Sequence, residues 1–456
     1  MPSKTLNFDA LRSGLAGRII LPGDADYDAS RTVMYGGIDK KPAVIVRARN
    51  AGDVKQAVNF ARDNGLEIAV RSGGHSAAGH STTEGGLVVD LREMTAIEID
   101  AAGKAAWAEA GATALEVSKA ATEQGLVVGF GDAGSVGLGG ITTGGGVGYL
   151  SRKYGLTIDS LLAAEVVTAD GRVVETDAEI EPDLFWAVRG GGGNFGVITR
   201  FKFKLSPLPE FTGGMMCLPA TPETIAGFVA AAEAASENLG TIANIMPAPP
   251  MPFLPADQHG KLVILGMMAY AGPPDEAEKA LKPFRDLAKP LADFVKPGPY
   301  LSMYPPEDPD YHPTAVAKNL FVDHVGRPEA ETIVKQLNES DASLRVAQIR
   351  VLGGAVNRVP ADATAYAHRK AKIMLNVAAF YDGASDKPKK LAWVDTFASV
   401  LNQGDKAAYV NFVADEGAER VKAAYPGATW DRLRKIKKQY DPQNLFHLNQ
   451  NIPPAA

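Results

Sequence analysis

The stretch GDAGSVGLGGITTGGGVG, from Gly131 to Gly148, decides the fold, because nine of its eighteen residues are glycine. Glycine loses more backbone entropy on folding than any other residue, so this density needs a reason. Two interpretations are open: a set of tight turns, or a loop whose backbone amides wind into nests that bind pyrophosphate without a lysine. The density exceeds what turns need, and we therefore expect a phosphate cradle.

A second Gly-rich loop lies upstream, at Arg71-Ser72-Gly73-Gly74-His75-Ser76. It directly follows a predicted strand, and its glycines let the backbone come close to a ligand. A histidine at a strand end in such a loop is a candidate functional residue, and the alternative is a histidine that only caps the loop. The hexapeptide alone leaves both interpretations open.

A third glycine cluster, GGGNFG at 191–196, matches the dinucleotide-binding pattern G-x-G-x-x-G. That pattern requires a helix after the glycines, whereas Val197-Ile198-Thr199-Arg200-Phe201 has the composition of a strand. The context therefore excludes a Rossmann nucleotide site here.

Hydrophobic periodicity outlines two regions. Apolar residues at helical spacing predict a helix over 51–64, ended by Gly65, between strands at 43–47 and 68–71, which is a β-α-β unit. Thr113 is a plausible N-cap for a helix that runs to residue 124. Further strands are predicted at 86–90, 106–108, 161–168 and 197–205.

After Pro207 the pattern changes, because proline becomes frequent and longer helices are predicted. A mixed sheet covered by these helices would form a second domain, and a basic amphipathic helix over 430–438 precedes a turn-rich tail. The helices are predicted at 222–238, 273–288 and 329–339, and the strands at 261–271, 344–352 and 372–381.

Composition excludes several classes of protein. The chain has 456 residues, 46% of them hydrophobic, which is enough for two or three globular domains. Its net charge is -6 and it has no cluster of five Lys or Arg, so we expect no nucleic acid and no membrane as partner. Cys217 is the single cysteine, and residues 1–21 lack the apolar core of a secretion signal. We expect a reduced, cytoplasmic protein without a metal site.

Several motifs together are more specific than any one of them. The loop at 71–76 and the Gly-rich stretch are followed by SRKYGLTID at 151–159 and DLFWAVRGGGGNFG at 183–196. This series resembles the FAD-binding domain of the vanillyl-alcohol oxidase superfamily. The tail, YDPQNLF at 440–446 with NQNI at 449–452, is similar to the C-terminal signature of berberine bridge enzyme-like oxidases.

The resemblance implies an α+β fold with a two-part FAD-binding domain. Residues 1–206 would form its main part and residues 406–456 would return to it, while residues 207–405 would form a substrate domain of antiparallel or mixed sheet covered by helices. It also implies FAD bonded covalently to His75 through the 8α-methyl group of the ring. Ala133 occupies the position of the cysteine that gives many relatives a second link, so one link is expected.

The resemblance further implies which residues contact the cofactor. Val136 matches a position where a small side chain leaves dioxygen access to the flavin, which favours an oxidase over a dehydrogenase. The implied cofactor-binding residues are Arg71, Ser72, Gly73, Gly74, His75, Ser76, Gly79, Ala133, Ser135, Val136, Gly139, Gly140, Thr143, Gly144, Gly145, Gly146, Gly148, Val197, Ile198, Asn449 and Asn451.

Four polar residues are the candidates for substrate chemistry, which needs a base or hydrogen-bond acceptor beside the flavin. They are Asn411, Gln348, Arg350 and Tyr381, and each has the alternative of being a structural polar residue. Phe412 stands where sugar-oxidising relatives commonly have a tyrosine, and His368-Arg369 is interpreted as a structural contact.

We therefore expect an FAD-dependent oxidase. Hydride would pass from a CH-OH or CH-NH group of a small-molecule substrate to flavin N5, with dioxygen as acceptor and hydrogen peroxide as product. The alternatives are a dehydrogenase with another acceptor and a flavin-binding protein without turnover. The sequence specifies neither the substrate nor an oligomeric state.

Overall fold

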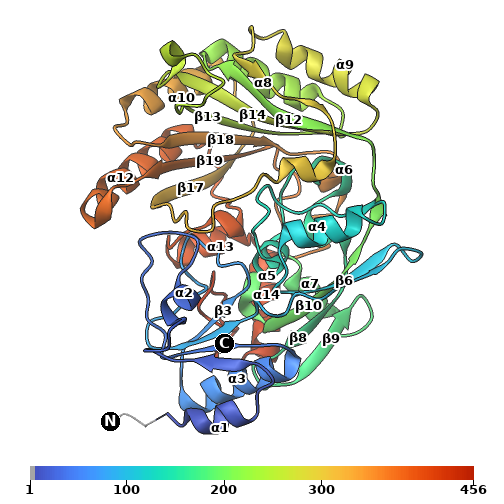
Figure 1. The fold of residues 1–456 in the computed structure, drawn as a ribbon, viewed down its shortest axis with the longest axis vertical. Coiled ribbons are helices and arrows are strands. Elements are labelled where there is room, and N and C mark those ends of the chain that lie inside the picture. The colour runs from blue at the N-terminus through green and yellow to red at the C-terminus, as the bar shows by residue number, and fades with distance from the viewer. Residues whose placement is uncertain (1–5) are drawn as a thin grey trace.

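The computed structural model describes residues 6–456, so residues 1–5 of the N-terminal segment lie outside it. Two sheets form the N-terminal region up to residue 206 (Figure 1). The first has the order β1 (Arg18–Ile20), β2 (Val44–Arg47), β4 (Leu87–Asp90), β3 (Ile68–Arg71). The second has the order β5 (Ile97–Asp100), β6 (Ala105–Glu109), β10 (Val197–Lys204), β8 (Leu161–Val167), β9 (Val173–Asp177).

The predicted β-α-β unit is confirmed, with one refinement of its pairing. Helix α3 (Ala51–Asn64) begins after Asn50, whose side chain accepts a hydrogen bond from the Asp53 amide, and ends at Gly65 with φ +66°. Strands β2 and β3 are not neighbours, because each pairs in parallel with β4, which lies between them. The unit therefore encloses a strand that comes later in the sequence.

Short helices and turns fill the rest of this region. The N-cap expected at Thr113 is confirmed, since Thr113 and Glu116 form a capping box. The helices are α1 (Phe8–Ser13), α2 (Tyr27–Arg31), α4 (Ala114–Thr122), α5 (Leu138–Gly144), α6 (Ser151–Tyr154) and α7 (Pro182–Val188), with single turns at Thr157–Ser160 and Gly192–Asn194. A small ribbon pairs β7 (Leu126–Val127) with β11 (Ser206–Pro207).

The middle region is built on one eight-stranded sheet in which every pair is antiparallel, so the antiparallel form is found and the mixed form is not. Its order is β15 (Ala292–Asp293), β12 (Phe211–Pro219), β14 (Leu262–Ala271), β13 (Leu239–Pro247), β18 (Arg345–Val351), β19 (Ile373–Phe380), β17 (Ala315–Val322), and β16 (Lys296–Pro297) also pairs with β12.

Helices cover the sheet face that points away from the N-terminal region (Figure 1). They bury a core in which the rings of Phe228 and Phe284 meet edge to face at 4.9 Å between centroids. The opposite face of the sheet therefore faces the N-terminal region. The covering helices are α8 (Pro222–Ala234), α9 (Pro274–Arg285), α10 (Arg327–Glu339) and α12 (Gly383–Leu401). The other short elements after residue 207 are helix α11 (Ala355–Arg358) and single turns at Ala256–Gln258, Tyr300–Met303 and Val410–Phe412.

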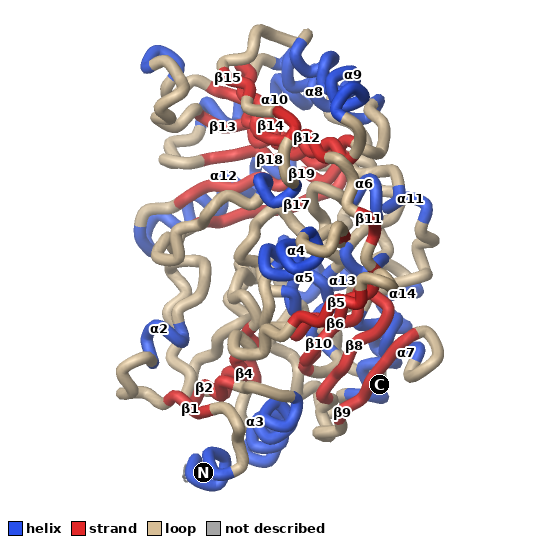
Figure 2. The backbone as a smooth tube through the Cα atoms, turned by 45° about the vertical axis from the view of Figure 1, so that its right-hand side comes forward, coloured by secondary structure: helices blue, strands red, loops and turns tan. Residues whose placement is uncertain are grey.

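The C-terminal segment returns to the N-terminal region. Helices α13 (Ala418–Ala424) and α14 (Ala428–Tyr440) place Val421, Leu433 and Ile452 in the same hydrophobic core as the two N-terminal sheets. Helices α4 and α5 lie between that core and the large sheet in both views (Figures 1 and 2). Within residues 6–456, no helix has the length and apolar character needed to cross a membrane.

One buried lysine anchors this return. The Lys437 side chain donates hydrogen bonds to the backbone carbonyls of Asn194 (2.7 Å) and Phe446 (2.9 Å) and to the Asp441 carboxylate (2.7 Å). Asp441 in turn accepts from the amides of Leu445 and Phe446. The tail motif YDPQNLF therefore closes a turn and ties it to the glycine cluster at 191–196.

Candidate active site

A cavity of about 530 Å³ lies between the N-terminal region and the open face of the large sheet. Its walls come from segments far apart in the sequence, since the loops after β3 and before α5 face the strands β18 and β19 and the tail. The predicted residues that line it are Ser72, Gly73, Gly74, His75, Ser76, Ala133, Val136, Gly139, Gly140, Thr143, Val197, Ile198, Gln348, Arg350, Asn411 and Asn449.

The two Gly-rich loops meet with their backbones in contact. A Cβ atom on Gly137 would lie 2.1 Å from the Gly73 nitrogen, and a Cβ on Gly73 would lie 2.3 Å from the Gly137 nitrogen. Ser72 joins the same contact, because its hydroxyl donates to the Ala110 carbonyl (2.6 Å) and accepts from the Gly139 amide (3.2 Å). Glycine is needed at both positions so that the loops can approach this closely.

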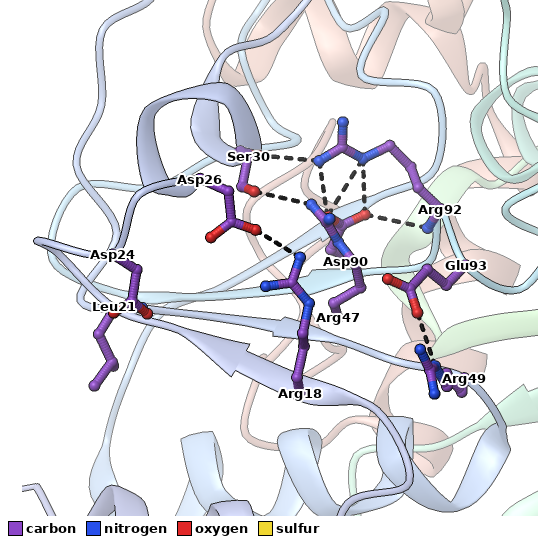
Figure 3. Close-up of polar contacts among 10 residues, drawn as sticks. All are labelled: Arg18, Leu21, Asp24, Asp26, Ser30, Arg47, Arg49, Asp90, Arg92 and Glu93. Atoms are coloured by element: carbon purple, nitrogen blue, oxygen red, sulfur yellow. Dashed lines mark hydrogen bonds and ion pairs between the residues drawn. The ribbon is translucent and has the colours of Figure 1, made fainter.

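An ion-pair network fixes the strand ends beneath the histidine loop (Figure 3). Asp90 is fully buried and accepts hydrogen bonds from Arg47 (3.0 Å) and Arg92 (2.9 Å). Burial raises the pKa of Asp90, but the hydrogen bond from Arg92 and the neighbouring guanidinium charges outweigh it, so this pKa lies below its ordinary value. Arg71 donates to the Ser30 carbonyl (2.5 Å), and burial lowers its pKa to about 10.

His75 is held by a contact that joins the two regions. Its Nε2 lies 3.0 Å from the Ser135 hydroxyl, which donates to the Glu307 carboxylate. The Ser135 amide also donates to Glu307 (3.1 Å). Because burial lowers the pKa of His75, the ring is neutral near pH 7, and the acceptor oxygen of Ser135 favours the tautomer with its proton on Nε2.

The sheet face above the cavity carries a row of amide side chains on paired strands. Gln348 on β18 pairs in register with Asn244 on β13 and with Asn376 on β19. The Gln348 amide donates to the Asn244 side-chain oxygen (2.9 Å), while its oxygen accepts from Arg350 (2.8 Å). Arg350 also donates to Asp132 of the Gly-rich stretch (2.7 Å), which joins the sheet to the loop below it.

Tyr409 and Asn411 close the cavity from the C-terminal side. The Tyr409 hydroxyl accepts from the amides of Gly146 (3.0 Å) and Val147 (3.3 Å) and from the Asn411 side chain (3.0 Å). The Asn411 amide group also donates to the Ile141 carbonyl (3.2 Å). Both contacts engage the nitrogen of Asn411, so its orientation is fixed.

Comparison with known proteins gives the same architecture. The family described as FAD binding domain matches residues 42–177, and the family described as berberine and berberine like matches residues 408–453. The chain is 32% identical to (R)-6-hydroxynicotine oxidase of Paenarthrobacter nicotinovorans, over 97% of this chain and 98% of that protein. The chain belongs to the berberine bridge enzyme-like family of FAD-linked oxidoreductases.

Further relatives agree. Xylooligosaccharide oxidase of Thermothelomyces thermophilus is 30% identical over 91% of this chain and 88% of that protein. The crystal structure of 6-hydroxy-D-nicotine oxidase from Arthrobacter nicotinovorans superposes with a TM-score of 0.86 at 28% identity, covering 97% of this chain and 98% of that one. The predicted α+β fold of a berberine bridge enzyme-like protein is confirmed.

The cavity has features that fit the FAD of this family. A Cβ on Gly140 would meet no atom within 4 Å and would point into open cavity space, so the backbone of α5 is accessible there. The Ser81 hydroxyl and the Asn449 side-chain oxygen are buried on the cavity wall without a protein partner. No lysine lines the cavity among residues 6–456, so phosphate groups would be bound by backbone amides and neutral side chains.

Some positions implied by the berberine bridge enzyme-like resemblance do not line the cavity. Arg71, Gly79 and Ser135 do not line the cavity, and Ser135 contacts its wall through His75 and Glu307. Tyr381 packs in the core of the large sheet with its hydroxyl against Gly37 and does not line the cavity, so we leave it out of the proposed site. Asn451 and the glycines Gly144, Gly145, Gly146 and Gly148 also lie outside the lining.

These last glycines have a packing reason. A Cβ on Gly144 would lie 1.9 Å from the Asn411 oxygen, and one on Gly146 would lie 2.0 Å from the Thr157 hydroxyl. A Cβ on Gly148 would lie 1.8 Å from the Phe130 carbonyl oxygen. The Gly-rich stretch therefore divides into a first half that lines the cavity and a second half that lets the tail and neighbouring loops approach closely.

Sequence reasoning missed several lining residues of this berberine bridge enzyme-like site. Asp132 lies inside the quoted Gly-rich stretch, and Asn376 is a lone polar residue in an apolar strand, so both gave a signal that could have been used. Tyr35 and Glu307 lie in irregular loops without a pattern. His368 donates from Nε2 to the Ala424 carbonyl (2.8 Å), outside the cavity, as a structural contact.

Proposed function

We propose that the chain is an oxidase with a single covalent FAD on His75, which oxidises a CH-OH or CH-NH group of a small molecule and delivers the electrons to dioxygen. The observation that carries this proposal is the place of His75, half-buried on the cavity wall beneath a polar sheet face. The flavin supplies the hydride acceptor and, in an oxidase, reacts with dioxygen to give hydrogen peroxide.

The residues of the N-terminal region hold the cofactor in this proposal. The first half of the Gly-rich stretch and the loop at 71–76 present backbone amides, and Gly140 leaves room for close approach. The lone pair of His75 that does not face Ser135 is the one available for the bond to the ring. Ala133 has no nucleophilic group and the single cysteine, Cys217, is buried in β12, which supports one link instead of two.

The substrate side consists of Asn411, Gln348 and Arg350. Their side chains come from the tail and from β18 and line the same cavity as His75. The nitrogen of Asn411 is engaged by Ile141 and Tyr409, and its oxygen packs against Gly144 without accepting a hydrogen bond from the described residues. We therefore assign this oxygen as the group that would accept a hydrogen bond from the substrate hydroxyl or amine. Such an acceptor orients the CH group that loses the hydride, and because an amide oxygen is too weak a base to keep a proton, the hydroxyl or amine proton would pass to water.

Val136 supports an oxidase over a dehydrogenase. It lines the cavity and is partly buried against the core of the N-terminal region. If dioxygen reaches the flavin past this side chain, then Val136→Leu should slow reoxidation in stopped-flow measurements and leave reduction by substrate almost unchanged. A parallel decline of both half-reactions indicates that Val136 only packs the loop.

The attachment is tested by acid precipitation. Wild-type protein should retain its flavin in the pellet, His75→Ala should release it, and His80→Ala, a matched change of a second cavity histidine, should retain it. Flavin that stays with the His75→Ala pellet would refute the assignment. Anaerobic bleaching by a panel of alcohols, amines and oligosaccharides separates an enzyme from a flavin carrier, and oxygen consumption separates an oxidase from a dehydrogenase.

A further inference from the structure

Arg350 has hydrogen-bonding capacity that the protein does not use. Its side chain is only 5% exposed, and its Nε and Nη2 donate to Gln348 (3.0 and 2.8 Å) and to Asp132 (2.7 Å). Its Nη1 has no partner although it is buried on the cavity wall. An unpaired buried donor on a charged group is costly, so a site with this feature is built for an acceptor that arrives with a ligand.

A complementary acceptor lies on the next strand. The side-chain oxygen of Asn376 is buried without a partner, on the cavity wall. Asn376 pairs in register with Gln348, two residues from Arg350 on the same face of β18. The sheet therefore holds one unpaired donor and one unpaired acceptor on adjacent strands that line the cavity.

Arg350 is the group of the cavity wall that could bind an anion, in a lining that also carries the carboxylates of Asp132 and Glu307. It is the only lysine or arginine that lines the cavity among the residues described. The two lining carboxylates are already engaged, Asp132 by Arg350 and Glu307 by the amide and hydroxyl of Ser135. The Arg350 guanidinium also faces the Phe412 ring at 5.3 Å, which occupies an aromatic surface that could otherwise bind a substrate ammonium group.

We propose that Arg350 determines substrate specificity by binding a carboxylate of the substrate, while Asn376 accepts from a hydroxyl or N-H group of the same molecule. The substrate class is then an organic acid that carries the CH-OH or CH-NH group to be oxidised. Arginine suits this role because its Nη1 carries N-H donors that no protein group uses, and these can form a charge-assisted hydrogen bond with a carboxylate. This inference rests on the proposed oxidase function, and it concerns binding and not the flavin link.

The test is isothermal titration calorimetry on the flavin-loaded protein with benzoate and acetate, and with benzyl alcohol, benzylamine and ethanol as their uncharged or cationic counterparts. We expect at least one carboxylate to bind about 10-fold or more tightly than its alcohol, and benzylamine to bind more weakly than benzoate. Arg350→Met should weaken carboxylate binding about 10- to 100-fold, the usual effect of losing a charge-assisted hydrogen bond, and Arg350→Lys should retain part of it.

Two controls separate specific binding from general effects. Arg358→Met removes an exposed arginine that pairs with Glu237, and should leave carboxylate binding unchanged. The double variant Arg350→Met with Asp132→Asn leaves no unpaired buried charge, and should bind carboxylates as weakly as the single variant. The proposal is overturned if no carboxylate binds more tightly than its alcohol, if benzylamine binds best, or if folded Arg350→Met binds carboxylates like wild type.

The outcome is independent of the attachment experiment. Flavin content and covalent fraction are measured on the same preparations before each titration. If His75 proves not to carry the flavin, calorimetry still shows whether the protein prefers carboxylates. If the protein shows no preference for carboxylates, the assignment of the flavin link to His75 is unaffected.

Discussion

Gly137, the N-cap of α5, and Gly140, within α5, should respond to substitution in opposite ways. Gly137 has φ −74° and ψ 142°, which any residue adopts, so Gly137→Ala tests steric fit alone. The added Cβ would lie 2.1 Å from both the Gly73 nitrogen and the Ser72 hydroxyl, more than 1 Å inside ordinary contact. The loops must separate, at about 1 to 3 kcal/mol for overpacking.

The same separation breaks the two hydrogen bonds of the Ser72 hydroxyl, with Ala110 and Gly139, at about 1 kcal/mol each. The total is about 3 to 5 kcal/mol, and we expect the thermal midpoint of Gly137→Ala to fall by roughly 5 °C. Gly140→Val should leave the midpoint nearly unchanged, because its Cβ meets nothing within 4 Å and valine is no worse than glycine in a helix. Its side chain enters the cavity, so flavin content should fall by about half or more.

The assay is circular dichroism melting together with the flavin-to-protein absorbance ratio. Fractions matched for flavin content are compared, because bound flavin itself raises the midpoint. A Gly137→Ala protein that melts like wild type would show that the two loops are not in tight contact. Full flavin occupancy in Gly140→Val would show that this turn of α5 is not part of the cofactor cradle.

Three further outcomes are expected. Ser135→Ala should lower the covalent flavin fraction, and Ser135→Thr should restore it, because a hydroxyl positions His75; equal fractions in acid-precipitated pellets would contradict this. Burial lowers the pKa of His80 to about 4, below the 6.5 of an unfolded histidine, so stability should fall as pH drops from 6.5 toward 4, by about 2 kcal/mol at pH 5. Urea titrations should show a flatter pH profile in His80→Gln. Lys437→Met should lower the free energy of unfolding by about 3 to 5 kcal/mol, because it leaves the charge of Asp441 buried and unpaired. In the same titrations, the double variant with Asp441→Asn should recover part of this loss.

The sequence predicted local elements well where the signal was local. Helix α3 was predicted with its bounds, since an Asn cap, helical spacing and a terminal glycine all lie within sixteen residues. Strands β12, β13 and β17 were missed, because they lie in or near segments rich in glycine and proline. Their conformation depends on pairing with partners that the sequence does not reveal.

The candidate site was predicted in part. His75 and the first half of the Gly-rich stretch line the cavity, whereas Gly144 to Gly148 pack against the tail and neighbouring loops. Glycine density signals close backbone approach, but it does not say whether the approaching atoms belong to a cofactor or to the protein. Tyr381 was proposed from its place at a strand end, but it does not line the cavity, and its hydroxyl lies against Gly37 of the N-terminal region.

The sequence by itself determined the family, the α+β class and the positions of the glycines and of His75, because these depend on residue type and on spacing along the chain. Only the tertiary structure decided the partners of those residues. Glu307 meets Ser135 from 172 residues away, and Arg350 meets Asp132 from 218 residues away. Such contacts depend on how the large sheet lies over the N-terminal loops, and that arrangement follows from packing of whole faces, which no local pattern encodes.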